Sequence, residues 1–154
     1  MNTTTAKKLG EVLALATAGN ETIEAHEALF RDTLGIEMTA HIIEMNDIHA
    51  KNIVHLADEA GTKATLLSRK EELVDKVRAM RDIYLADSNN KEDLFEWLSF
   101  FEGAAYGHWS LVKGLAETLE DEALTELADD ASNFHFELLN HIATELGEEG
   151  QQAV

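Results

Sequence analysis

The sequence predicts an all-α fold, a four-helix bundle assembled from two similar helix hairpins. The 154 residues include no proline, which would interrupt a helix, and apolar residues recur at helical spacing along almost the whole chain. One pattern of two histidines and a glycine also occurs twice, 86 positions apart. The two copies are His49, His55 and Gly61, and His135, His141 and Gly147. Two helix pairs that repeat each other in this way form a bundle with approximate twofold symmetry.

Five helices are expected within one domain that spans residues 1–154. Their expected ranges are 5–34, 39–60, 63–86, 92–119 and 122–146. Gly19 and Asn20 mark a point where the first helix can break, and Gly61 and Gly147 are expected to end two others, with a frayed tail after Gly147. The first two helices form one hairpin and the last two form the other. The helix at about 63–86 is an additional or crossover helix, which either crosses the bundle or packs beside it.

The charge of the chain limits its partners. The formal net charge is −18, and such a surface repels the phosphates of nucleic acid and of anionic lipid, so neither is expected to bind. The charge is uneven, because residues 92–149 carry 15 acidic side chains and one base, whereas six of the twelve bases lie within 63–81. An acidic, non-enzymatic interaction protein that binds a basic partner or mimics nucleic acid is therefore one functional hypothesis.

The sequence also bears on location and chemistry. No apolar run approaches the ~20 residues of a membrane span, so no membrane association is expected. Lys7, Lys8 and the short apolar stretch after them have the outline of a secretory signal, but Glu11 interrupts it and an amphipathic helix fits these residues well. We expect no cleaved signal and a cytoplasmic protein. The absence of cysteine excludes disulfides, thiolate metal ligands and cysteine nucleophiles.

Four histidines are predicted to face the core, one on each helix of the two hairpins. They are His26, His49, His108 and His135. Each lies in a stripe of apolar residues at helical spacing, although the stripe around His26 is weaker. The midpoint of 26 and 49 and the midpoint of 108 and 135 both fall on expected turns, which would place all four imidazoles at a similar height in the bundle.

Imidazoles in an apolar layer need polar partners, because an unpaired buried polar group costs about 1–3 kcal/mol. A metal ion satisfies several at once, and neutral imidazole is a good ligand for iron, zinc or copper. The predicted metal ligands are His26, His49, His108 and His135, with Glu102 and Glu137 as outer candidates. Two alternatives stay open. The histidines bond to each other, to carbonyl groups or to water as ordinary core residues, or they become charged near pH 5–6 and loosen a pH-responsive core.

The stretch Ile42–Gly61 combines an acidic residue, a histidine and an asparagine with a following Leu/Ala-rich run that ends in glycine. It is similar to small bacterial ferritin-like domains of unknown function. With its two repeated hairpins, the chain resembles the ferritin-like superfamily. The resemblance implies a four-helix bundle with two internal repeats, in which each helix pair supplies one Glu and one Glu-x-x-His to a di-iron centre.

The chain departs from the ferritin-like pattern at the carboxylates. Carried onto His49 and His135, the Glu-x-x-His motif has Asn46 and Ser132 where the glutamates belong. Glu102 matches the other carboxylate of one helix pair, whereas Asn20 stands at the equivalent position of the first pair. A ferroxidase needs several carboxylates to stabilise oxidised iron, so we expect no ferroxidase activity. Whether the protein is an enzyme stays open.

Five aromatic residues cluster on the expected helix 92–119. They are Trp97, Phe100, Phe101, Tyr106 and Trp109. This clustering favours core and interface packing over a cofactor-binding role. Because the rings spread over more than one face of the helix, part of the cluster is expected to meet the helix at 63–86 or another subunit of a homo-oligomer.

Overall fold

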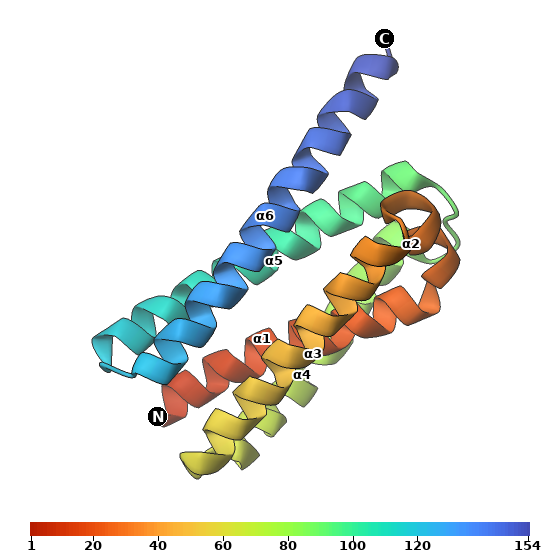
Figure 1. Cartoon of the computed structure of the whole chain (residues 1–154). Helices are drawn as coiled ribbons and strands as arrows, with labels where there is room; N and C mark the ends of the chain where they lie inside the picture. The colour runs from red at the N-terminus through yellow and green to blue at the C-terminus, as the bar shows by residue number, and fades with distance from the viewer.

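The computed structural model describes residues 1–154 and contains six α-helices and no β-strand, which confirms the predicted all-α fold. The helices are α1 (Thr3–Ala25), α2 (Glu27–Leu34), α3 (Ile36–Glu59), α4 (Lys63–Leu85), α5 (Lys91–Thr118) and α6 (Glu122–Gln152). They form a helical bundle in which α5 and α6 make a long hairpin beside α1, α3 and α4 (Figure 1). None of the six could cross a lipid bilayer, because each lacks the necessary apolar length.

The first helix is the central element of the bundle. Fourteen of its 23 residues are buried, and it contacts α3, α4 and α5. A Cβ at Gly10 would lie 2.6 Å from a backbone carbonyl oxygen of α4, so the glycine permits a close approach of the two helices. The ion pairs Glu11–Arg69 and Glu21–Arg78 show that α4 runs parallel to α1. The helix predicted at about 63–86 thus packs along α1 as a member of the bundle.

Local sequence signals set where the long helices begin. Asn2, Asn90 and Asp121 each accept a hydrogen bond from a backbone N–H in the first turn of α1, α5 and α6. Gly35 and Gly61, with φ values of 87° and 68°, occupy the left-handed region at the two turns that flank α3. These caps and turns confirm the expected hairpin positions.

Two predicted helix ends were wrong. The first helix breaks at His26, where φ is −125° and ψ is 33°, and not at Gly19 and Asn20. Gly19 stays helical because it serves close packing, since a Cβ there would lie 2.9 Å from a phenylalanine ring of α5. Gly147 lies inside α6, which continues to Gln152 instead of fraying. A helical glycine costs only about 1 kcal/mol, which the neighbouring turns can offset.

The buried interior consists of two large apolar clusters with polar side chains between them. Each cluster contains 13 buried residues. Along α3 the boundary between the clusters falls between Ile42 and Ile53, and along α6 it falls between Ala131 and Leu138. The sequence-predicted histidines His49 and His135 lie inside these two intervals. The fold therefore places a polar layer across the middle of the bundle.

Candidate functional site

Five buried polar side chains form the layer between the two apolar clusters, which we call the polar layer. Asn46 and His49 come from α3, Glu102 from α5, and Ser132 and His135 from α6. None is more than 8% exposed. The residues on α3 and on α6 are spaced three apart, so each pair shares one face of its helix. This is the only place where three helices bring buried histidine and carboxylate side chains together.

Glu102 and His135 form the central contact of the polar layer. The His135 Nδ1 lies 2.5 Å from the Glu102 Oε2, and neither side chain is more than 4% exposed. Such a short contact between an imidazole and a carboxylate is a charge-assisted hydrogen bond in which Nδ1–H donates. Burial is costly for either charge alone, so each group depends on the other.

His49 is the side chain of the polar layer with an unused polar atom. Its Nε2 lies 3.4 Å from Asp130 Oδ2, whereas its buried Nδ1 has no hydrogen-bond partner. Burial lowers the pKa of His49 below its ordinary value, and the neighbouring His135 lowers it further. In the neutral ring with Nε2–H directed at Asp130, Nδ1 carries a lone pair. The rings of His49 and His135 are 6.1 Å apart, centre to centre.

The remaining polar atoms of the layer differ in how well they are satisfied. Asn46 donates to the Asn20 side chain at 2.9 Å, and Asn20 donates in turn to the exposed Asp47 at 3.0 Å. The Ser132 hydroxyl is buried without a partner. A cavity of about 10 Å³, roughly the space of one water molecule, is lined by Asn46 and Glu102 together with apolar neighbours. A site with two orphaned polar atoms and a small void is incompletely satisfied in the protein alone.

Two of the predicted site residues, His26 and Glu137, lie outside the polar layer. His26 is half-buried at the break between α1 and α2, because the chain leaves the helix there and the height predicted from a continuous helix does not apply. Burial lowers the pKa of His26, with a further contribution from Arg81. Glu137 is exposed on α6. Neither side chain contacts the Glu102–His135 pair.

His108 also departs from its predicted inward position, since its side chain is 44% exposed. Its Nδ1 donates to the carbonyl oxygen of Ala104 at 2.8 Å, and its Nε2 lies 3.6 Å from a Glu11 oxygen. The buried stripe of α5 runs through Glu102 and Trp109 instead. The reason is geometric, because a helix with 3.6 residues per turn rotates away from a strict seven-residue repeat.

The donor set determines which metal centre these residues suit. No group of three or more His, Asp and Glu side chains is spaced to hold a metal ion in the present rotamers. A di-iron centre does not fit, because the polar layer has Glu102 as its one carboxylate, whereas a di-iron centre needs several. One imidazole nitrogen of His49 is free, and the Glu102–His135 hydrogen bond uses only His135 Nδ1 and Glu102 Oε2. The other ring nitrogen of His135 and the other oxygen of Glu102 are the atoms that could bind an ion while this hydrogen bond holds the imidazole in place.

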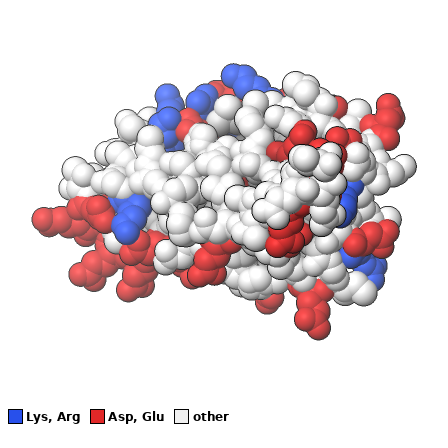
Figure 2. Space-filling view, turned by 90° about the horizontal axis from the view of Figure 1, so that it is seen from above, with Lys and Arg blue, Asp and Glu red and all other residues white.

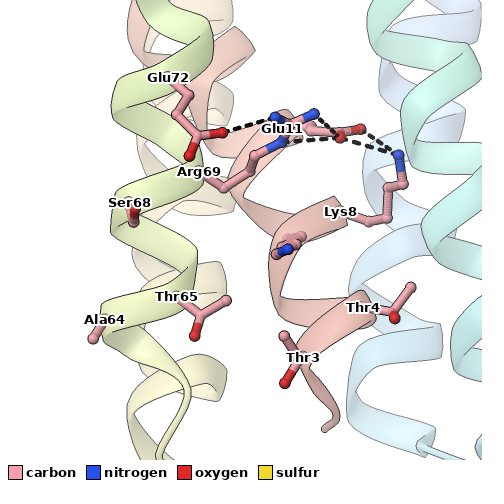
Figure 3. A pocket seen from close by; sticks show the side chains of 10 residues that line it. Thr3, Thr4, Lys8, Glu11, Ala64, Thr65, Ser68, Arg69 and Glu72 are labelled. Carbon is pink, nitrogen blue, oxygen red and sulfur yellow. Dashed lines mark hydrogen bonds and ion pairs between the residues drawn. The ribbon is translucent and has the colours of Figure 1, made fainter.

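A large, mostly polar cleft lies apart from the polar layer and shares no residue with it. It has a volume of about 650 Å³ and lies between the first turns of α1 and α4 (Figure 3). Glu11 dominates it, held by Lys8 at 3.0 Å and Arg69 at 2.8 Å, while Arg69 also binds Glu72. Burial alone would raise the pKa of Glu11, but the hydrogen bonds from Arg69 and Lys8 outweigh it and the pKa is lowered. Lys8 and Arg69 are thus paired with Glu11 and Glu72, whereas the exposed Lys7 of the same cleft forms no ion pair.

Asp130 is a polar contact of His49 that the sequence did not indicate. Its side chain is 65% exposed, and by pattern it belongs to the solvated face of α6. Only the packing of α3 against α6 brings it to His49. Comparison with known proteins adds no further assignment: no protein-family model, no curated protein sequence and no solved structure gives a significant match to this chain.

Proposed function

We propose that the protein binds a single transition-metal ion, iron, zinc or copper, in the polar layer through His49, His135 and Glu102. The observation that carries the proposal is the Nδ1 of His49, which is buried without a partner beside the Glu102–His135 pair. Two neutral imidazoles and one carboxylate are a ligand set that these metals accept. An ion would satisfy the orphaned nitrogen of His49, and the Glu102–His135 hydrogen bond would orient the second imidazole toward it.

The same residues support the proposal that the bundle is ferritin-like in its arrangement. The positions carried over from that pattern are Asn20, Asn46, His49, Glu102, Ser132 and His135. Asn20 bonds Asn46, His49 neighbours His135, and His135 bonds Glu102. With one buried carboxylate in place of several, we propose a metal-binding protein without ferroxidase activity.

Cobalt titration tests the metal site directly, because Co²⁺ bound to imidazole and carboxylate absorbs visible light. The wild-type chain, purified without chelator and analysed for metal content, is expected to bind about one equivalent of ion. His49→Ala with His135→Ala should abolish stoichiometric binding, since both nitrogen ligands are removed. Glu102→Gln should weaken binding by at least about 10-fold, the lower end for loss of even a supporting carboxylate, since Glu102 is the one carboxylate of the ligand set.

The matched control is His26→Ala with His108→Ala, which removes two imidazoles outside the polar layer. This variant should retain full binding. If it loses the ion as completely as the His49/His135 variant does, the four-histidine site predicted from the sequence is right and the three-residue site is wrong. If the wild-type chain binds no ion, both are wrong.

The charge distribution supports a second candidate function, an acidic surface for a basic partner. Figure 2 shows acidic side chains at the lower left and again toward the right of this face, with a group of basic side chains at the upper edge and a few elsewhere. The segment 92–149 has 15 acidic residues and one base. An oligolysine peptide should bind at low salt and dissociate at high salt, because exposed charges are screened beyond about 8–10 Å. Binding that is absent at low salt would remove this candidate.

A further inference from the structure

A second cavity lies between α1, α4 and α5 and shares no residue with the five of the polar layer. Its volume is about 260 Å³, and eight of its eleven lining residues are apolar. The apolar residues come from all three helices: Leu15, Leu73, Val77, Met80, Trp97, Phe100, Phe101 and Ala104. Pockets for drug-sized ligands usually begin near 300 Å³, so this cavity suits a smaller molecule.

Aromatic rings form one wall of the cavity and its opening. Trp97 packs against Phe101 at 5.5 Å between ring centres, and Phe100 stacks on Tyr84 at 5.9 Å. Phe100 and Met80 are 39% and 40% exposed, so apolar side chains also surround the opening. Methionine is unbranched and adapts to irregular shapes, which allows the opening to accommodate a guest. The wall chemistry therefore selects a hydrocarbon or aromatic body.

The polar side chains of the cavity determine which polar group a ligand can carry. Glu11 is already held by Lys8 and Arg69, as Figure 3 shows, so its carboxylate has no free capacity for a cationic ligand. His108 is also occupied, because its Nδ1 bonds the carbonyl oxygen of Ala104 and its Nε2 faces a Glu11 carboxylate oxygen at 3.6 Å.

Lys76 is the polar group of the cavity with free capacity. Its helix neighbours Lys70 and Arg78 form ion pairs, whereas Lys76 forms none. The ammonium of Lys76 is thus the group left to interact with a ligand. It complements a carboxylate, since it donates hydrogen bonds with a full positive charge.

We propose that this cavity binds a small apolar monocarboxylic acid, such as a medium-chain fatty acid, with its body between α4 and α5 and its carboxylate at Lys76. The proposal is independent of the metal site, because the two use different residues.

Octanoate and 1-octanol are matched probes, because they share the same alkyl chain and differ in the charged group. By calorimetric titration, octanoate is expected to bind at one site per chain and about fivefold more tightly than octanol, the range of a partly exposed ion pair. Lys76→Met should remove this difference. Lys51→Met is the control, since Lys51 is an exposed lysine on α3 that lies outside the cavity. It should leave the fivefold preference unchanged.

Filling the cavity tests the location of the site. Ala104→Trp should abolish binding of both probes while the circular dichroism spectrum and cooperative unfolding persist. If that variant does not fold, Trp97 fluorescence tests the location instead. In a Trp109→Phe variant, Trp97 is the remaining tryptophan and lines the cavity, so octanoate is expected to shift its emission. Octanol binding as tight as octanoate, unchanged binding by a folded Ala104→Trp variant, or a silent Trp97 would each overturn the proposal.

Discussion

Breaking the Glu102–His135 pair from one side should cost far more than replacing both partners. Both side chains are at most 4% exposed and lie 2.5 Å apart, so His135→Leu leaves a carboxylate buried in the core without its donor. Removing one partner of a buried pair typically costs about 3–5 kcal/mol. At roughly 2–4 °C per kcal/mol for a chain of this size, that corresponds to a melting temperature lower by about 10 °C.

Replacing both Glu102 and His135 is expected to have the opposite effect on stability. Glu102→Met with His135→Leu removes the two costs of desolvation together, and such apolar replacements are often neutral or stabilising by about 1–4 kcal/mol. The double variant should therefore be more stable than either single variant. Urea unfolding followed by far-UV circular dichroism measures all three, and equal m-values would show that the comparison is valid.

The control for this cycle is His141→Leu, a half-buried histidine on the same helix, which should change stability by no more than about 0.5 kcal/mol. Additive single-variant effects, or singles that cost under about 1 kcal/mol, would refute the inference that the two groups depend on each other.

Other consequences concern packing and pH. Gly10→Ala should destabilise the protein by about 1–3 kcal/mol, because a Cβ there would lie 2.6 Å from a backbone oxygen. Gly107→Ala meets open space and should stabilise the protein by about 0.5–1 kcal/mol. Equal melting temperatures for the two variants would contradict this. The lowered pKa of His49 means that the unfolded chain takes up a proton near pH 6.5 while the native chain does not, so the stability of the metal-free protein should fall as pH drops below about 7. His49→Leu should flatten that pH dependence and, because it removes an orphaned nitrogen, stabilise the protein by about 1 kcal/mol. A wild-type melting temperature that stays constant from pH 8 to pH 5 would disprove the predicted pH dependence. The lowered pKa of Glu11 contributes stability that is present above pH 4.5 and lost as pH falls through the native pKa, so Glu11→Gln should lose less stability than the wild type on acidification, as acid titration of the far-UV signal can measure.

The sequence predicted much of the secondary structure because caps and periodicity are local. Asn90 and Asp121 cap helices at the expected turns, and Gly61 adopts the left-handed turn predicted for it. Gly147 fits the same rule by type, yet α6 continues through it. A glycine permits a helix end without requiring one, so the neighbouring residues decide.

The candidate site was predicted in part. The duplicated pattern correctly indicated that His49 and His135 belong together, and their rings are neighbours in the core. The same reasoning failed for His26 and His108. Their positions depend on a helix break and on a rotation of the buried stripe by about one residue, and neither can be read from a repeat in the sequence.

The sequence by itself determined that the chain is helical, where most helices begin, how its charge is divided and which two histidines are equivalent. Helix formation and helix starts depend on residues within a few positions of each other, whereas the charge division and the repeated histidine pattern are properties of the sequence that need no structure to be seen. Only the tertiary structure decided that Glu102 is the partner of His135, that Asp130 reaches His49 and that His49 keeps an unpaired nitrogen. Those contacts join residues 33 and 81 positions apart, and they depend on how helices are rotated and packed against one another.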